Sequence, residues 1–315
     1  MLKMELRSSI SDLGLPHYAA GEEVAIKLHM GERGNRTYIR PRTVRRLVEN
    51  LQDKGCDVFV TDTTTLYQRK RSNPEDYMET AAINGFTEEN VGCPVKIADA
   101  EGDRKVGNVF IAKDLFEADR LLVLSHATGH ISTGFAGAVK NVAMGCVSKR
   151  GKRYIHSAGW PRYREDRCKR CGDCVEACPF GFVMLNDRIE LDLKDCPACE
   201  RCLNACPEGA LWRPADAMDE CFRRYAETCR TVLSCFPDPL FINELNRVTK
   251  FCDCSVDPGP VISPDLGFLA ASDPIEIDLE SVRLITECNP LASEIFGSTW
   301  RDFVSQLMAG MEKKA

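Results

Sequence analysis

The chain has 315 residues, of which 44% are hydrophobic and 28% charged, so it carries enough apolar material for a folded core. No apolar run approaches the roughly 18 residues of a membrane span, and the N-terminal stretch is charged where a signal peptide is apolar, which predicts a cytoplasmic protein. The net charge of −6 argues against a protein that coats nucleic acid.

The first half of the chain predicts a parallel sheet. Residues 24–29 fit a buried strand, residues 41–54 carry apolar side chains at helical spacing, and residues 57–61 fit a second strand. A strand, a helix and a strand in succession place the two strands parallel. A further central strand is predicted over residues 120–125, followed by a helix rich in small residues over 134–146.

Helix and strand patterns resume in the last third of the chain. The predicted elements are a helix over 216–234, a strand or strand with turn over 241–250, and helices over 274–287 and 292–311. We therefore expect one α/β, parallel-sheet-containing domain made of residues 1–163 and 213–315, with residues 164–212 inserted as a separate module.

Two cysteine runs of identical spacing lie within that insertion. The chain holds 17 cysteines, far above ordinary usage, and a chain of this length does not need disulfide staples. Thiols in such number are typical of metal ligands in a reducing compartment. Each run has three cysteines separated by two residues, then a fourth after three residues and before proline: Cys168, Cys171, Cys174 and Cys178, then Cys196, Cys199, Cys202 and Cys206.

This spacing resembles that of bacterial two-cluster ferredoxins. In that pattern three cysteines of one run bind one 4Fe–4S cluster, and the fourth binds the other cluster. We predict a first cluster held by Cys168, Cys171, Cys174 and Cys206, and a second held by Cys196, Cys199, Cys202 and Cys178. The alternative is a pair of zinc sites, although zinc ribbons use two Cys-x2-Cys pairs separated by a longer loop.

Polar side chains gather where the predicted strands end: Lys27, His29, His126, His130, Lys140 and Asn141. In an open parallel sheet, ligands bind beyond the carboxyl ends of the strands. A pocket with lysines and imidazoles would suit a small anionic substrate, such as a carboxylate or a phosphate. The alternatives are that these groups satisfy one another, or that His126 and His130 hold a metal, which would require a helix that Gly129 makes doubtful.

Cys252 and Cys254 flank Asp253 outside the two runs. On a strand, residues two apart point to one face, where the thiols could bind an extra metal or act as redox thiols. The alternative is two buried thiols with no chemical role.

Taken together, the motifs identify a family resemblance. Residues 27–35, 61–67, 126–141, 252–254 and 271–274, with the two cysteine runs, resemble the ferredoxin-fused branch of the domain of unknown function 362 family. The resemblance spans nearly the whole chain. It implies the architecture and the clusters, but the family has no activity assigned to it as a group.

The function we expect is that of an iron–sulfur redox protein, an oxidoreductase if it acts on a substrate. An electron donor or acceptor protein would exchange electrons with two 4Fe–4S clusters, which would feed a substrate or metal site in the α/β domain. One alternative is a non-catalytic electron carrier or a subunit of a larger redox complex. A further alternative is a metallochaperone or maturation factor.

Overall fold

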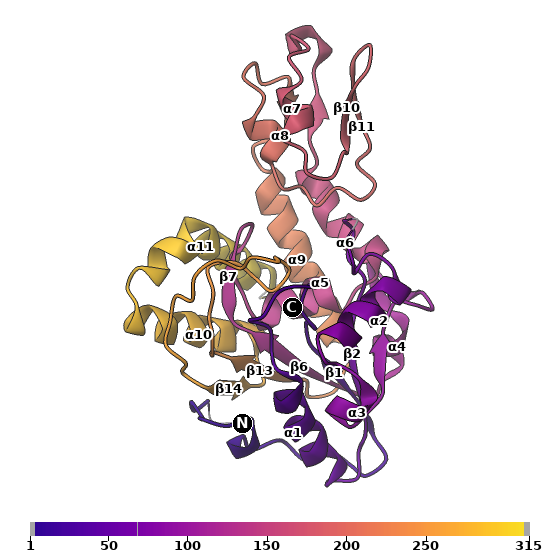
Figure 1. Cartoon of the computed structure of the whole chain (residues 1–315), viewed down its shortest axis with the longest axis vertical. Helices are drawn as coiled ribbons and strands as arrows, with labels where there is room; N and C mark the ends of the chain where they lie inside the picture. The colour runs from indigo at the N-terminus through magenta and orange to yellow at the C-terminus, as the bar shows by residue number, and fades with distance from the viewer. Residues whose placement is uncertain (1–3, 68, 312–315) are drawn as a thin grey trace.

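A six-stranded sheet forms the centre of the computed structural model, which describes residues 4–67 and 69–311 (Figure 1). In spatial order its strands are β14 (Phe268–Ala271), β13 (Leu240–Glu244), β6 (Arg120–His126), β1 (Glu23–Lys27), β2 (Asp57–Asp62) and β3 (Val95–Ile97). The strands from β13 to β3 run parallel, and β14 pairs antiparallel with β13 at the edge. The prediction of an α/β fold with a parallel-sheet core is confirmed.

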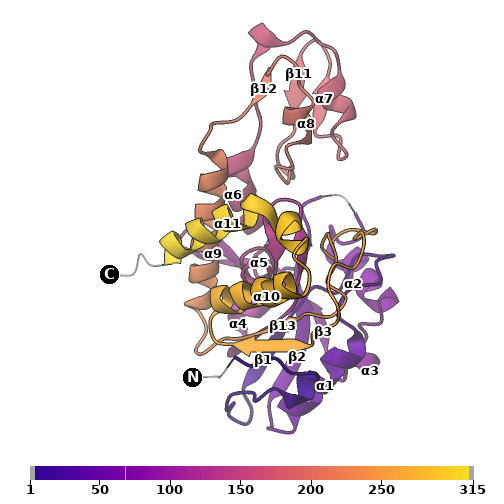
Figure 2. The ribbon, with the colours of Figure 1, turned by 90° about the vertical axis from the view of Figure 1, so that its left-hand side faces the viewer.

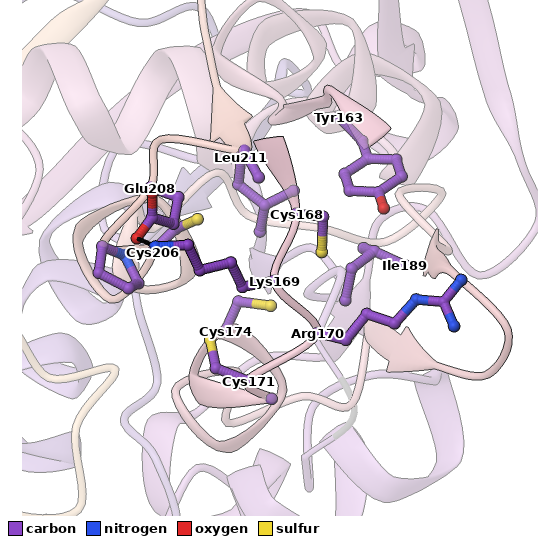
Figure 3. Close-up of a pocket in the computed structure, with 13 residues that line it drawn as sticks. Tyr163, Cys168, Lys169, Arg170, Cys171, Cys174, Ile189, Cys206, Glu208 and Leu211 are labelled. Atoms are coloured by element: carbon purple, nitrogen blue, oxygen red, sulfur yellow. Dashed lines mark hydrogen bonds and ion pairs between the residues drawn. The ribbon is translucent and has the colours of Figure 1, made fainter. Parts of the chain in front are cut away.

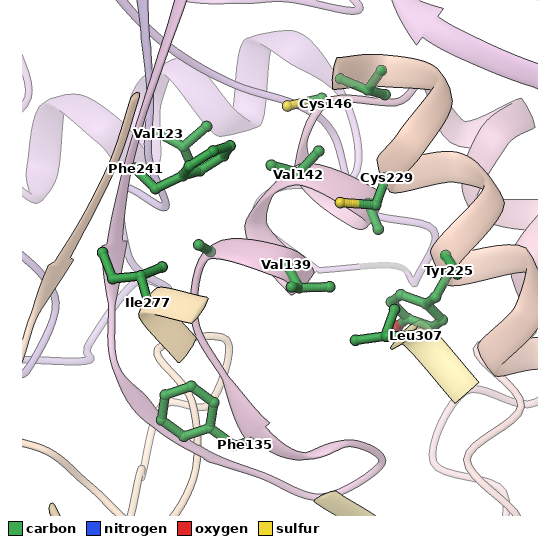
Figure 4. Packing of buried hydrophobic residues seen from close by; sticks show 14 of the residues in the cluster. Val123, Phe135, Val139, Val142, Cys146, Tyr225, Cys229, Phe241, Ile277 and Leu307 are labelled. Carbon is green, nitrogen blue, oxygen red and sulfur yellow. The ribbon is translucent and has the colours of Figure 1, made fainter. Parts of the chain in front are cut away.

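Helices cover both faces of this sheet, and successive residues of a strand pack on opposite faces. Val24 and Ile26 of β1 lie in the cluster that includes the apolar side of α1 (Pro41–Gln52), whereas Ala25 lies in the other cluster. That second cluster contains α5 (Ala138–Gly145), α9 (Ala217–Leu233), α10 (Pro274–Cys288) and α11 (Ala292–Met311) (Figures 2 and 4). The helices over 41–54, 216–234, 274–287 and 292–311 thus lie close to where the sequence predicts them.

The helix predicted over residues 134–146 begins later, because a hairpin precedes it. Strands β7 (Thr128–His130) and β8 (Gly134–Ala136) pair antiparallel before α5 starts at Ala138. The Asp278 carboxylate accepts hydrogen bonds from the backbone N–H groups of Ala138 and Val139, which fixes this start. With His126 at the end of β6 and His130 in β7, the two histidines are not on one helix.

The strand predicted over residues 241–250 ends at Glu244. Arg247 adopts the left-handed conformation with φ of 54°, which extended chain cannot accommodate, and it forms a turn after the strand. Other elements were not predicted: the sheet strands β3 and β14, α2 (Pro74–Ile83), α3 (Glu88–Val91), β4 (Asp103–Val106), β5 (Val109–Ala112), α4 (Lys113–Glu117), α6 (Lys149–His156), and the short helices η1 (Ile10–Asp12), η2 (Ser157–Gly159) and η3 (Glu165–Arg167).

Residues 162–212, which we call the cysteine lobe, stand apart from the sheet beyond the ends of α6 and α9 (Figures 1 and 2). Within the described chain, the cysteine lobe contributes no strand to the central sheet. Its elements are β9 (Arg162–Tyr163) paired with β12 (Leu211–Trp212), β10 (Val183–Leu185) paired with β11 (Ile189–Leu191), and the one-turn helices α7 (Asp173–Glu176) and α8 (Arg201–Asn204). No described helix of the protein is long and apolar enough to cross a membrane.

Candidate functional site

Two pockets in the cysteine lobe are each lined by four cysteines. Cys168, Cys171, Cys174 and Cys206 line the first pocket (Figure 3). Cys178, Cys196, Cys199 and Cys202 line the second. Each set joins three cysteines of one run to the last cysteine of the other, which is the combination that a crossed ligand arrangement requires.

The backbone repeats itself around the two pockets. Arg170 and Gly172, which flank Cys171, have φ of 56° and 88°, and Ala198 and Glu200, which flank Cys199, have φ of 52° and 66°. For residues other than glycine, each left-handed conformation costs about 1 kcal/mol or more. Three residues other than glycine adopt this costly conformation beside Cys171 and Cys199, which indicates that the placement of the cysteines around the pockets determines the shape of the loops.

The donor set of each pocket suits an iron–sulfur cluster, whose usual ligands are four thiolates. A tetrahedral zinc, the alternative, needs four sulfurs about 2.3 Å from one point. The thiols line spaces of about 360 Å³ and 410 Å³, which include parts open to solvent. Among the described residues, no group of three His, Cys, Asp or Glu side chains that could hold a metal ion is found.

Burial and the neighbouring thiols raise the pKa of Cys174, Cys196 and Cys202. Burial raises the pKa of Cys196 to about 12, and the neighbouring Cys199, Cys202 and Cys178 raise it too. Burial likewise raises the pKa of Cys202 to about 11. Iron ions in the pocket would replace the protons of these thiols, since thiolates are the ligands of iron–sulfur clusters.

At the carboxyl ends of the strands, Lys27 belongs to a buried polar network. Its ammonium lies 2.8 Å from Asp62 Oδ1 and donates to Asn141 Oδ1 at 2.6 Å. Tyr77 donates a short hydrogen bond to the same carboxylate. Burial alone would raise the pKa of Asp62, but Lys27 and His29 hold it below its usual value. Lys27 and Asn141 are thus occupied by protein partners.

His126 is held between two acceptors. Its Nδ1 donates to Asp253 Oδ2 and its Nε2 to the Asn246 carbonyl, both at 2.8 Å. Burial opposes the charged ring, yet Asp253 raises the pKa of His126 above its ordinary value. The ring therefore carries both protons and anchors Asp253, the residue between Cys252 and Cys254.

Cys252 and Cys254 lie in a tight turn rather than on a strand. The Ser255 backbone N–H donates to the Cys252 carbonyl at 3.0 Å, which closes the turn and brings the two thiols close enough for each to shift the pKa of the other. Both side chains are partly exposed. We call these two cysteines, with the groups that contact them, the thiol centre.

Three further groups surround the Cys254 sulfur. His29 Nε2 lies 3.4 Å away, and the Tyr67 hydroxyl is hydrogen-bonded to it. His29 Nδ1 accepts the Gly31 N–H, and its Nε2 faces both the Cys254 sulfur and Arg71 Nη1, which lies 2.7 Å away. Arg71, 1% exposed, donates to Tyr67 and pairs with Glu32.

These contacts divide the two thiols into different protonation states. Donation from Cys252, assisted by His29 and Lys140, holds the pKa of Cys254 well below its usual value although burial opposes this. The same hydrogen bond, together with burial, raises the pKa of Cys252. These contacts therefore favour the thiolate form at Cys254 and the protonated form at Cys252.

Lys140 supplies an unused positive charge beside the thiol centre. Its charge acts to lower the pKa of both thiols. Burial lowers the pKa of His130 most, and Lys140 lowers it further. Within the described residues, Lys140 has no hydrogen-bond or ion-pair partner. His130 Nδ1 accepts from the backbone of its own hairpin, at Ser132 and Thr133. An anion could therefore bind at Lys140 without displacing a protein group.

A row of aromatic rings connects the second pocket to the thiol centre. Phe180 and Phe182 line that pocket, and their rings stack with centroids 5.7 Å apart. Phe180 also stacks on Tyr67 at 5.7 Å, and Tyr67 contacts Cys254. We call Tyr67, Phe180 and Phe182 the aromatic bridge.

The structure brings part of the predicted pocket together. His29, His130, Lys140, Cys252 and Cys254 lie in one neighbourhood, while Lys27, His126 and Asn141 support it from protein-bound positions. A role of any of them in substrate binding stays a prediction.

Sequence reasoning missed Arg71 as a site residue. Arg71 is one of several basic residues in an unpatterned loop, and only its ion pair with Glu32 distinguishes it. Tyr67 closes the polar run that follows the second strand, which sequence reasoning placed at the site without giving Tyr67 a role of its own.

Comparisons with known proteins give a family but no activity. Residues 24–283 match the model of the family described as Domain of unknown function (DUF362), so the chain belongs to this family. No match was found among curated proteins.

Among solved structures, the chain is similar to the lactate racemase apoprotein from Thermoanaerobacterium thermosaccharolyticum, with a TM-score of 0.42 and 14% identity, covering 90% of this chain and 57% of that one. It is also similar to a Thermotoga maritima protein, with a TM-score of 0.38 and 12% identity, covering 90% of this chain and 56% of that one. The chain thus spans a little over half the length of either protein.

Proposed function

We propose that this member of the domain of unknown function 362 family is an iron–sulfur redox protein. In this proposal the cysteine lobe is a ferredoxin-like module with two 4Fe–4S clusters, and the sheet domain holds the site with which they exchange electrons. The observation that carries the proposal is the pair of four-cysteine pockets, each assembled from both runs. Each cluster, when bound, stores and releases one electron.

The two pockets differ in their surroundings, which supports a direction for electron movement through the protein. The first pocket is lined by residues of the cysteine lobe, and its Cys171 is exposed. The second is lined also by Gly159 and Pro161, at the junction with the sheet domain. The first pocket would therefore face the external donor or acceptor, and the second would serve the sheet domain.

Basic side chains beside the first pocket favour an acidic redox partner. Arg162, Arg167, Lys169 and Arg170 are exposed there. Complementary charge accelerates the association of two proteins and orients them, without requiring a large interface. A surface of this kind suits transient docking of an electron-transfer protein.

The thiol centre is the feature that favours an oxidoreductase over a simple electron carrier. A carrier needs only the clusters and a docking surface. This chain also places a thiolate, an unpartnered Lys140 ammonium and an aromatic bridge next to the second pocket. A lysine without a protein partner beside a thiol of lowered pKa supports a substrate site, and the lysine favours an anionic substrate.

The first experiment measures the clusters directly. Protein purified without oxygen should contain about eight iron and eight acid-labile sulfide per chain. Cys178→Ala should damage the cluster bound mainly by Cys196, Cys199 and Cys202, and Cys206→Ala should damage the other. Cys288→Ala, which removes an exposed cysteine outside the lobe, is the matched control and should keep all the iron.

Stoichiometric zinc in the anaerobic protein, or iron for one cluster alone, would contradict the proposal.

To separate an oxidoreductase from a carrier, the reduced protein is titrated with a small carboxylate or with phosphate. Anion binding that Lys140→Ala abolishes, with iron content unchanged, would support a substrate site. Electron transfer to other proteins with no such binding would favour the carrier.

A further inference from the structure

We propose that Cys252 and Cys254 are a redox-active pair that cycles between a dithiol and an intramolecular disulfide, and that its substrate is a disulfide. The inference rests on the proposed function, because the electrons come from the two clusters. It adds the acceptor of those electrons and the chemical class of the substrate.

The turn places the two cysteines where a disulfide can form. A disulfide requires Cα atoms about 4.4–6.8 Å apart, and a hydrogen-bonded β-turn brings its first and last Cα atoms to less than about 7 Å. Cys252 and Cys254 are the first and third residues of such a turn, and each thiol lies close enough to shift the pKa of the other. Bond formation therefore needs a rotation of side chains rather than a movement of the loop.

The anchoring of the turn keeps this geometry in place. Asp253, between the two cysteines, is 4% exposed and pairs with His126. Its backbone carbonyl accepts from the Glu32 N–H at 3.0 Å, and its carboxylate accepts from Thr37. The residue between the thiols is thus fixed on both its backbone and its side chain, while the thiols themselves are partly exposed.

The surroundings of Cys254 favour thiol chemistry over metal binding. His29 Nε2, which lies 3.4 Å from the Cys254 sulfur, lies 2.7 Å from Arg71 Nη1. A guanidinium at that distance occupies the position that a metal ion would take. Positive groups around a sulfur instead favour the thiolate, which is the nucleophile of thiol–disulfide exchange.

The oxidative half of the cycle follows from the different roles of the two thiols. The Cys254 thiolate attacks one sulfur of the substrate disulfide, which breaks that bond, forms a mixed disulfide and releases one substrate thiolate. Cys252 gives its proton to this thiolate and then attacks the Cys254 sulfur. The Cys252–Cys254 disulfide forms, and the second substrate thiolate leaves and takes a proton from solvent.

The reductive half restores the pair. Two electrons, which two reduced clusters would supply one each, and one proton would break the Cys252–Cys254 bond and return a Cys252 thiol and a Cys254 thiolate. The net reaction converts one substrate disulfide into two thiols at the expense of two electrons and two protons. Two one-electron clusters match this requirement, and the aromatic bridge ends at the sulfur that accepts the electrons.

The test uses the full-length holoprotein, purified without oxygen and freed of excess reductant. Oxidised glutathione, whose carboxylates can pair with Lys140, is the disulfide probe. Free thiols are then blocked with iodoacetamide, and the peptide that carries both cysteines is examined by mass spectrometry. We expect a Cys252–Cys254 disulfide and release of glutathione thiol, neither of which Cys254→Ser should show.

The second step delivers electrons to the oxidised protein from photoreduced deazaflavin, a one-electron donor. We expect the peptide to return to the dithiol while the paramagnetic signal of the reduced clusters decays. Phe180→Leu, which removes the ring between the second pocket and Tyr67, should slow this step severalfold and leave the glutathione step unchanged. Phe116→Leu, which changes a partly exposed ring on α4, is the matched control and should behave as the unmodified protein.

Iron and sulfide are measured in the same samples, so the two proposals can fail separately. If reducible clusters are present but the peptide stays dithiol with oxidised glutathione, the inference is overturned and the proposed function stands. Equal reduction rates in the Phe180→Leu and Phe116→Leu proteins would also overturn it, because the electrons would not come through the lobe. Absence of iron overturns both.

Discussion

The sheet domain and the cysteine lobe are stabilised by different means. The sheet domain buries two extensive hydrophobic clusters, one on each face of the central sheet. The buried cluster of the cysteine lobe consists of Cys174, Val183, Ile189 and Leu211, and one of these four is a cysteine of the first pocket. A segment of this size with so small a core needs metal, disulfides or a partner to fold. The comparison indicates that the cysteines determine the fold of the lobe, whereas hydrophobic packing determines the fold of the sheet domain.

Removing the clusters should produce the largest difference in stability between the cysteine lobe and the sheet domain. Iron chelation under denaturant-free conditions should abolish amide protection throughout residues 162–212, because metal binding supplies the folding free energy of such segments. The strands of the central sheet should keep their protection. Hydrogen exchange followed by mass spectrometry checks this. Equal loss in both regions would mean that they form one cooperative unit.

The reverse experiment weakens the sheet domain and leaves the lobe intact. Phe241 is fully buried on β13, and Phe241→Ala should destabilise the sheet domain by about 3–5 kcal/mol through loss of apolar contact and a residual cavity. Iron content should not change. Chemical denaturation, followed by the cluster absorbance and by circular dichroism in parallel, separates the two regions. Loss of iron at the same denaturant concentration would contradict their independence.

A smaller effect is expected at the anchor of the thiol centre. Asp253→Asn removes the carboxylate that pairs with His126 and should cost about 2 kcal/mol, typical of a hydrogen bond to a charged group. Val256→Asn, at an exposed position of the same loop, is the control.

The cost of Asp253→Asn should depend on pH. The pKa of His126 is raised in the folded protein, so its charge contributes fully to the stability of the fold below the ordinary histidine pKa of about 6.5. This contribution is lost as pH rises through the raised pKa. His126 and Thr37 hold the pKa of Asp253 low against burial, so its contribution is complete above about 3.9 and is lost as pH falls through the lowered pKa. Unfolding measured from acid to alkaline pH should show the largest difference between those two values. A constant difference would exclude an ion pair.

The smallest effect concerns the junction of the two regions. Arg153 of α6 donates to Asp195 of the cysteine lobe at 2.8 Å, with both side chains 26% exposed. Such pairs contribute about 1 kcal/mol or less, so Arg153→Met should barely change stability or iron content. Thermal unfolding in low and high salt measures this. A large loss of iron would show that this contact, and not the clusters, holds the lobe in place.

Much of the architecture could be predicted because local patterns decide it. The apolar residues of α1 recur at helical spacing, and the strands of the parallel sheet are nearly continuous apolar runs. The hairpin before α5 could not be predicted from the local sequence. A side chain at Gly134 would collide with the Phe296 backbone, and Asp278 caps α5 from a distant part of the chain. Both contacts are between residues distant in sequence.

The candidate site divides in the same way. The grouping of cysteines across the two runs could be predicted because their spacing resembles that of two-cluster ferredoxins, in which the fourth cysteine of each run binds the other cluster. The thiol centre depends on long-range contacts: Cys254 meets His29 and Tyr67 from other strand ends, and Arg71 is placed by Glu32. The pattern Cys-x-Cys suggested a strand, whereas a hydrogen bond from Ser255 makes it a turn.

The crossed arrangement of the two cysteine sets has a consequence for how heat inactivates the protein. Clusters bound in this way would act as cross-links that tie the two ends of the lobe together, so the chain could not open without releasing iron and sulfide. Released inorganic sulfide and iron do not reassemble on the timescale of cooling. Heat inactivation of the lobe would therefore be irreversible, and its midpoint would shift with the rate of heating, even where the sheet domain refolds. The working lifetime of the protein would then be governed by the kinetics of iron loss rather than by an equilibrium.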